Sequence, residues 1–152
     1  MPSTVADIPF LYRFILTWFE PAAALNGAVL CLFWPALFLQ TFTTVTYRPD
    51  HQVMFDQLAA TYILFTFLEA VVLRITSELR VWKAVVFGIL LCDAVHLYGA
   101  WGVMGTESFL SPATWRPEEW VNFAMLYGPG AVRVGLLFEV GFPTTTRGVK
   151  RA

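Results

Sequence analysis

Three carboxylic acids and one arginine interrupt long apolar segments of this 152-residue chain. Glu20, Glu69 and Asp93 each lie in a different apolar run, and Arg133 lies in a fourth. An ionised side chain at the centre of a membrane-spanning helix costs about 2.5–3.5 kcal/mol on insertion scales. Ionisable groups in such segments are therefore candidates for function by default.

The four residues are expected to lie at similar depths, so they could form one site. One arginine can hold one or two carboxylates by paired hydrogen bonds. We expect the remaining acid to keep its proton, because another negative charge in a dry bundle is unfavourable. A carboxylic acid beside a carboxylate can act as general acid and general base. We predict Asp93 and Glu69 as this pair, Glu20 as a third acid or water-positioning group, and Arg133 as the residue that orients a carboxylate; the sequence does not indicate which acid is protonated.

Further polar residues could bind or orient a substrate: Tyr62, Asn122, His96, Tyr98 and Asn26. His96 follows Asp93 by about one helical turn and shares its face. Each also has a structural interpretation, since histidine and asparagine commonly form hydrogen bonds between membrane helices. The sequence has no metal-ligand spacing, phosphate-binding loop or haem-attachment motif, so we expect neither a metal nor a cofactor.

The composition predicts the elements that must position these residues. The chain is 57% hydrophobic and only 14% charged, whereas soluble domains have about 25% charged residues. We predict an all-α integral membrane four-helix bundle forming a single domain over residues 1–152. Each span has about the 20 residues that a bilayer requires; the expected spans are residues 10–33, 54–75, 81–103 and 120–142. Pro21 and the Gly128-Pro129-Gly130 segment predict kinks in spans one and four.

Basic residues predict the orientation. In a four-span topology, most of them lie on the side that holds both termini, which the positive-inside rule assigns to the cytoplasm. That side holds Arg13, Arg74, Arg80, Lys83, Arg147, Lys150 and Arg151, and the other side holds Arg48 and Arg116. We therefore expect both termini inside, in an internal eukaryotic membrane such as the endoplasmic reticulum.

The net charge and the small residues limit the classes of partner that we expect. The net charge of −1 gives no field that would attract nucleic acid, so membrane lipids and a lipophilic small molecule are the expected partners. Alanine and glycine surfaces on spans one and three could support a homo-oligomer. Cys31 and Cys92 lie within apolar spans and are expected to be buried thiols, not a disulfide framework.

Four segments carry a resemblance to a known family: LYRFILTWFEPAAALNGA, LEAVVLR, SELRVWKAVVFGILLCDAVHLY and WVNFAMLYGPGAVRVGLLF. Together they resemble small four-helix fungal integral membrane proteins over nearly the whole chain. The resemblance implies a role in opening epoxides, with water or an internal nucleophile, in polyketide and meroterpenoid biosynthesis. A more distant likeness is to the larger fungal membrane terpene cyclases, whose extra spans prevent any transfer of residue roles.

Three functions are compatible with these residues. The first is a cofactor-free membrane epoxide hydrolase or cyclase that acts on a lipophilic secondary metabolite taken from the bilayer. The second is a sterol- or terpenoid-type isomerase or cyclase, in which the same acids transfer a proton. The third is a non-catalytic lipid-binding or scaffold protein, in which the charges only hold the bundle together. The catalytic hypotheses require that the four charged residues converge on a hollow with room for a guest molecule.

Overall fold

The computed structural model describes residues 4–143, and every regular element in this range is a helix. A continuous helical run begins with α1 (Phe10–Phe14), passes through the π-helical turn η2 (Ile15–Phe19) and continues as α2 (Glu20–Phe33). The other helices are α3 (Pro35–Gln40), α4 (Gln52–Phe67), α5 (Leu73–Ile75), α6 (Leu79–Phe109) and α7 (Pro117–Leu137). Short turns complete the order: η1 (Val5–Asp7), η3 (Pro49–His51), η4 (Leu68–Val72, π-helical) and η5 (Pro112–Thr114).

Three of the described helical runs are long and apolar enough to cross a membrane. They are Phe10–Phe33, Pro49–Ile75 and Leu79–Phe109. The all-helical class with several candidate spans is therefore confirmed. The expected fourth span is not among them: α7 has 21 residues and ends at Leu137, and residues 138–141 form a turn. Arg147, Lys150 and Arg151, used above for the orientation, lie outside the described residues.

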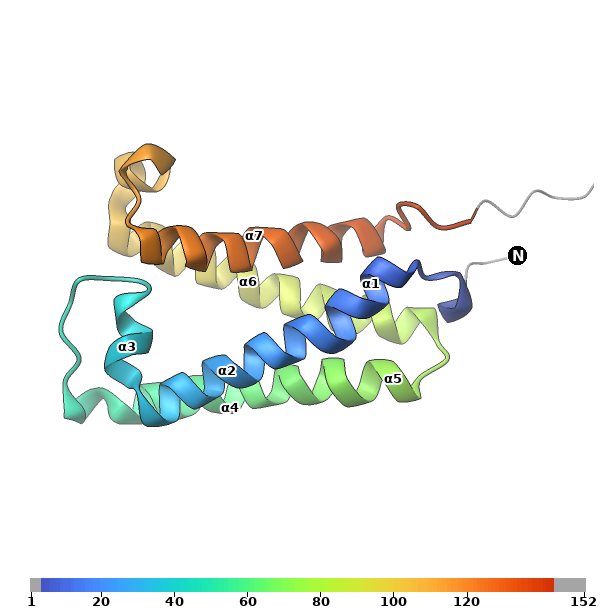
Figure 1. Cartoon of the computed structure of the whole chain (residues 1–152), viewed down its shortest axis with the longest axis horizontal. Helices are drawn as coiled ribbons and strands as arrows, with labels where there is room; N and C mark the ends of the chain where they lie inside the picture. The colour runs from blue at the N-terminus through green and yellow to red at the C-terminus, as the bar shows by residue number, and fades with distance from the viewer. Residues whose placement is uncertain (1–3, 144–152) are drawn as a thin grey trace, which may run out of the picture.

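The long helices form two antiparallel pairs. α2 packs along α4, and α6 packs along α7. Figure 1 shows that the start of α1 and the end of α7 lie at the same end of the bundle, while α3 lies across the opposite end. At the α1 end, Tyr12 donates a hydrogen bond to the Val140 carbonyl (2.9 Å) over Gly135, where a Cβ would lie 2.7 Å from the tyrosine oxygen. Contacts of this kind hold the two pairs together at this end.

Two apolar clusters fill the bundle at different heights. The cluster at the α1 end, which we call the apolar plug, consists of Ile8, Leu16, Leu73, Trp82, Val86 and Leu136. The second cluster lies under α3 and consists of Ala28, Cys31, Phe38 and Ala59. The buried charged residues lie along the helices between these two clusters, because Glu20 follows Leu16 by one turn on the first run and Arg133 precedes Leu136 on α7.

Two helix breaks differ from the sequence expectation. The backbone turns at Trp34 (φ −136°, ψ 53°), and residues 35–40 form a separate short helix beyond the expected span of residues 10–33. Gly105 has φ +75°, a conformation that glycine adopts without a steric penalty. This residue bends the end of α6, which continues for another turn to Phe109.

Candidate functional site

Arg133 of α7 brings the three acids together. Its Nε and Nη2 atoms both donate to Oε2 of Glu20 on α2, at 3.0 and 2.5 Å. Its Nη1 atom donates to Oδ2 of Asp93 on α6. Its Nη2 atom also lies 3.8 Å from Oε1 of Glu69 in η4. One guanidinium therefore joins four helical segments that are distant in sequence.

The three carboxyl groups differ in how Arg133 holds them. Glu20 accepts two hydrogen bonds and Asp93 accepts one, whereas Glu69 accepts none from the guanidinium. The side chains of Glu20 and Glu69 are 3% and 2% exposed, and that of Asp93 is 16% exposed. Oε1 of Glu20 and Oε1 of Glu69 are buried without a hydrogen-bond partner in the described part of the chain. The two side chains are close enough to share a hydrogen bond when one of them carries a proton.

A defect in the first helix positions Glu20. Pro21 has no N–H, so the α-helical hydrogen bond to the Thr17 carbonyl cannot form. The preceding turn is π-helical, and the Glu20 N–H bonds to the Ile15 carbonyl instead. Arg74 donates to the Thr17 carbonyl, and its guanidinium lies 4.1 Å from the centre of the Trp18 ring. The kink expected at Pro21 is thus a π-turn whose freed carbonyl is paired with a side chain from the neighbouring span.

A second π-turn positions Glu69. Glu69 lies inside η4, where the Leu73 N–H bonds to the Leu68 carbonyl, five residues earlier. Such turns are rare and occur often at functional sites. Asp93, by contrast, projects from the regular part of α6, and Arg133 follows Pro129 by about one turn on α7. Two of the three acids therefore depend on a local change of helical register that the sequence pattern did not predict.

A cavity of about 280 Å³ lies between the two helix pairs, and the four charged residues line one end of it. The end under α3 is apolar and mostly aromatic. Its lining was not predicted from the sequence and includes Phe38, Phe42, Leu58, Phe65 and Met125. Val121 and Met125 are also 63% and 41% exposed, so the cavity reaches the outer surface of the bundle beside α7.

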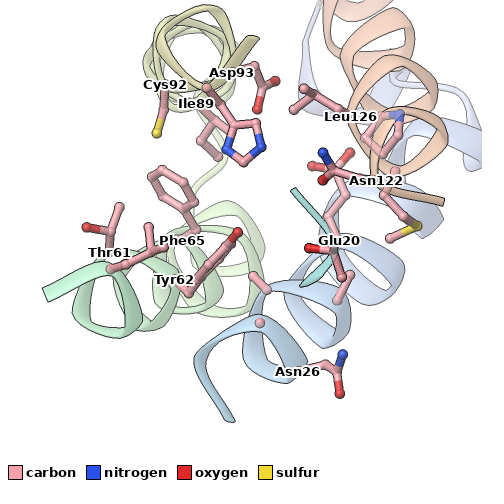
Figure 2. Close-up of a pocket in the computed structure, with 18 of the residues that line it drawn as sticks. Glu20, Asn26, Thr61, Tyr62, Phe65, Ile89, Cys92, Asp93, Asn122 and Leu126 are labelled. Carbon is pink, nitrogen blue, oxygen red and sulfur yellow. The ribbon is translucent and has the colours of Figure 1, made fainter. Parts of the chain in front are cut away.

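Most of the predicted secondary residues line this cavity. Tyr62, His96, Asn122 and Asn26 are among the lining residues. Figure 2 shows Asn122 and Leu126 on the side of Glu20, with Thr61 and Cys92 opposite; Asn26 lies apart from the acids at the edge. Tyr98 is a correction, because it is 69% exposed and packs beside Trp101 outside the cavity. It follows His96 by two residues, and this spacing places it on the opposite side of a helix.

Tyr62 is fixed by a close approach to α2. A Cβ on Gly27 would lie 3.2 Å from three atoms of the Tyr62 ring, so the ring packs directly on the backbone of the facing helix. Phe38 packs against the same ring, with centroids 6.0 Å apart. In Figure 2 the Tyr62 hydroxyl points into the space between the four helices. The hydroxyl is therefore placed to donate to or accept from a guest.

His96 and α3 close the cavity at the other end. The His96 ring packs against Phe42, with centroids 5.0 Å apart. The Gln40 carbonyl, at the end of α3, accepts a hydrogen bond from Arg116 at the start of α7 (3.3 Å). Among residues 4–143 no group of three His, Cys, Asp or Glu residues has an arrangement that could hold a metal ion. The arrangement can supply proton donors and acceptors to a guest whose remaining surface is apolar.

Comparison with known proteins gives a family without a described activity. No curated protein matches this sequence, and no solved structure matches this fold. Residues 5–142 match a family described as Domain of unknown function (DUF7704). This match spans almost all of the described structure, including every charged residue of the cavity. The chain therefore belongs to the DUF7704 family.

Proposed function

We propose that this protein is a cofactor-free membrane enzyme that opens an epoxide on a lipophilic secondary metabolite, by hydrolysis or by cyclisation. The observation that carries the proposal is the cluster of three carboxyl groups around one guanidinium, whose four residues all line one cavity. One arginine cannot neutralise three carboxylates, so one acid is left to carry a proton beside two carboxylates at the same cavity.

The hydrogen bonds of Arg133 suggest the protonation states. Glu20 and Asp93 accept charge-assisted hydrogen bonds and are assigned as carboxylates. Together they already exceed the single positive charge of the guanidinium. Glu69 is the most buried acid and accepts no hydrogen bond from Arg133, so a third negative charge there would be the least compensated. We assign Glu69 as the group that carries the proton.

These protonation states assign each residue a role in opening an epoxide. Glu69 gives its proton to the epoxide oxygen as one C–O bond breaks. Asp93 accepts a proton from the incoming nucleophile, a water molecule or a hydroxyl of the substrate, as the new C–O bond forms. Glu20 and Arg133 fix the geometry of both groups. The proton then returns from Asp93 to Glu69 past the shared guanidinium, so atoms and charge balance and no cofactor is consumed.

The apolar lining supports a lipophilic substrate. The aromatic end of the cavity suits a hydrocarbon chain, and the charged end suits the reacting group. The exposed lining residues Val121 and Met125 lie on the outer face of α7. In a bilayer this face borders lipid, so a substrate dissolved in the membrane could enter from the side without passing through water.

We further propose that α7 is a fourth span. At about 1.5 Å per residue its 21 residues reach about 30 Å, the thickness of a bilayer core. It packs along α6, and its one deeply buried charge is paired. Basic residues at the end of the bundle that holds α1 support a cytoplasmic placement of both termini. The endoplasmic reticulum remains the proposed compartment.

Product analysis with oxygen-18 water tests the activity. The protein in nanodiscs is incubated with lipophilic epoxides that carry or lack an internal hydroxyl, and products are analysed by mass spectrometry. Hydrolysis incorporates the label, whereas cyclisation gives an unlabelled isomer. Glu69→Gln and Asp93→Asn should each reduce turnover by about 10²-fold or more, the usual contribution of a general acid or base.

Asp56→Asn provides the matched control. Asp56 is an exposed acid on the same span as Glu69, outside the cavity lining, and its substitution should leave turnover within about twofold. Absence of turnover for every epoxide would reject the proposal. Turnover that survives both Glu69→Gln and Asp93→Asn would reject the assigned roles. Double-bond migration without epoxide opening would favour the proton-transfer isomerase.

A further inference from the structure

Two prolines in the bundle each remove one backbone donor. Pro21 leaves the Thr17 carbonyl without its helical partner, and Pro129 does the same to the Met125 carbonyl. Within a membrane such freed carbonyls are usually paired again by side chains, water or neighbouring helices. Arg74 serves this role at Thr17. No side chain in residues 4–143 donates to the Met125 carbonyl.

The residues on either side of the carbonyl freed by Pro129 lie on the wall of the cavity. Met125 and Pro129 both line the cavity, and the carbonyl of a helical residue points toward the residue four positions later. α7 is α-helical from Pro117 to Leu137 and has no π-helical turn like the one before Pro21. Asn122, one turn before Met125, lines the same wall and adds a second polar group beside the carbonyl.

We propose that this wall binds a hydroxyl group of the substrate, which donates its hydrogen bond to the Met125 carbonyl. A hydroxyl is suited because it donates to the carbonyl and can accept from the Asn122 amide. The inference deepens the proposed function, on which it rests for the identity of the reacting group. It restricts the substrate to lipophilic molecules that carry a hydroxyl.

The spacing on α7 sets where this hydroxyl lies. Met125 and Arg133 are eight residues apart, so their α-carbons are separated by about 12 Å along the helix. The Arg133 side chain extends back toward the start of the helix and shortens this separation at the guanidinium. The hydroxyl is therefore several bonds away from the epoxide, and serves as a binding group distinct from the reacting centre.

A pair of simple ligands isolates the hydrogen bond. Binding of 1-hexadecanol and of hexadecyl methyl ether to the full chain in nanodiscs is measured by native mass spectrometry. The two ligands have similar hydrocarbon chains, but the ether has no hydroxyl and cannot donate a hydrogen bond. The wild-type protein should bind the alcohol about threefold to tenfold more tightly, the effect of one net hydrogen bond. In Pro129→Ala the restored backbone N–H of residue 129 bonds to the Met125 carbonyl, so the alcohol and the ether should bind about equally well.

Pro117→Ala is the control, because Pro117 is an exposed proline at the first position of the same helix and lies outside the cavity lining. This variant should keep the wild-type preference for the alcohol. Equal binding of the two ligands by the wild-type protein, or no binding of the alcohol, overturns the inference. A preference that persists in Pro129→Ala also overturns it. A hydroxyl preference together with no turnover of any epoxide would reject the proposed function and leave the hydroxyl site standing.

Discussion

The pairing of Arg74 with the carbonyl freed by Pro21 predicts that these two residues are energetically coupled. Arg74→Met keeps the apolar stem but removes the donor and the charge. In the wild-type background it leaves the Thr17 carbonyl unpaired, and loss of a charged hydrogen bond costs about 1.5–3 kcal/mol. Loss of the contact with the Trp18 ring adds about 0.5–1 kcal/mol.

In a Pro21→Ala background the same substitution should cost much less. The alanine that replaces Pro21 supplies a backbone N–H that can bond to the Thr17 carbonyl, so only the contact with the Trp18 ring is lost. The expected cost of Arg74→Met then falls to about 0.5–1 kcal/mol. The difference between the two backgrounds, about 1.5–3 kcal/mol, is the coupling energy of Arg74 with the missing N–H.

The assay is unfolding of the purified protein in mixed micelles by increasing sodium dodecyl sulfate, followed by tryptophan fluorescence. The wild type, both single variants and the double variant complete the cycle. Arg80→Met is the control, since Arg80 is an exposed arginine in the same membrane boundary region and makes no described hydrogen bond. Additive effects, with a coupling below about 0.5 kcal/mol, would refute the explanation given for the π-turn before Glu20.

Two further predictions concern the charges and the orientation. Glu20→Gln should lower the free energy of unfolding by about 1.5–3 kcal/mol because it weakens the charged hydrogen bonds to Arg133, which stays paired with Asp93, whereas Glu69→Gln should change it by less than about 1 kcal/mol because glutamine resembles a protonated glutamate. Thermal unfolding in detergent measures both, and equal losses would contradict the assignment of the proton to Glu69. For the orientation, Ser77→Cys should react with a membrane-impermeant maleimide from the cytosolic side of intact microsomes, and Thr44→Cys only after detergent is added. The reverse pattern would overturn the placement of both termini.

The convergence of the charged residues was predictable because it depends on the regular rise of a helix and on which helices are neighbours. A rise of about 1.5 Å per residue gives the depth of each charge along its span, and the short connection between α5 and α6 makes their spans antiparallel neighbours. The cost of isolated charges in an apolar bundle then favours their pairing. These arguments were sufficient for Glu20, Glu69, Asp93 and Arg133, because each lies alone among apolar residues.

The sequence did not predict the features that depend on departures from regular α-helical geometry. Two π-turns set the directions of Glu20 and Glu69, and no residue pattern around Glu69 distinguishes a π-turn from an ordinary α-helical turn. The first span was expected to end at residue 33, but nothing in the sequence indicated that Phe38 and Phe42 would fold back over the cavity. Tyr98 was proposed from its residue type, although its spacing of two residues from His96 already placed it on another face of α6.

The apolar plug at the α1 end affects which nucleophile opens the epoxide, a water molecule or a hydroxyl of the substrate. Leu16, Leu73, Val86 and Leu136 are each at most 1% exposed and separate the charged cluster from the aqueous phase on that side. Water would have to arrive through hydrocarbon, where it is scarce. A hydroxyl that belongs to the substrate arrives with it and acts at a high effective concentration. Closure at this end of the bundle would therefore bias the reaction toward forming a ring within the substrate and away from forming a diol.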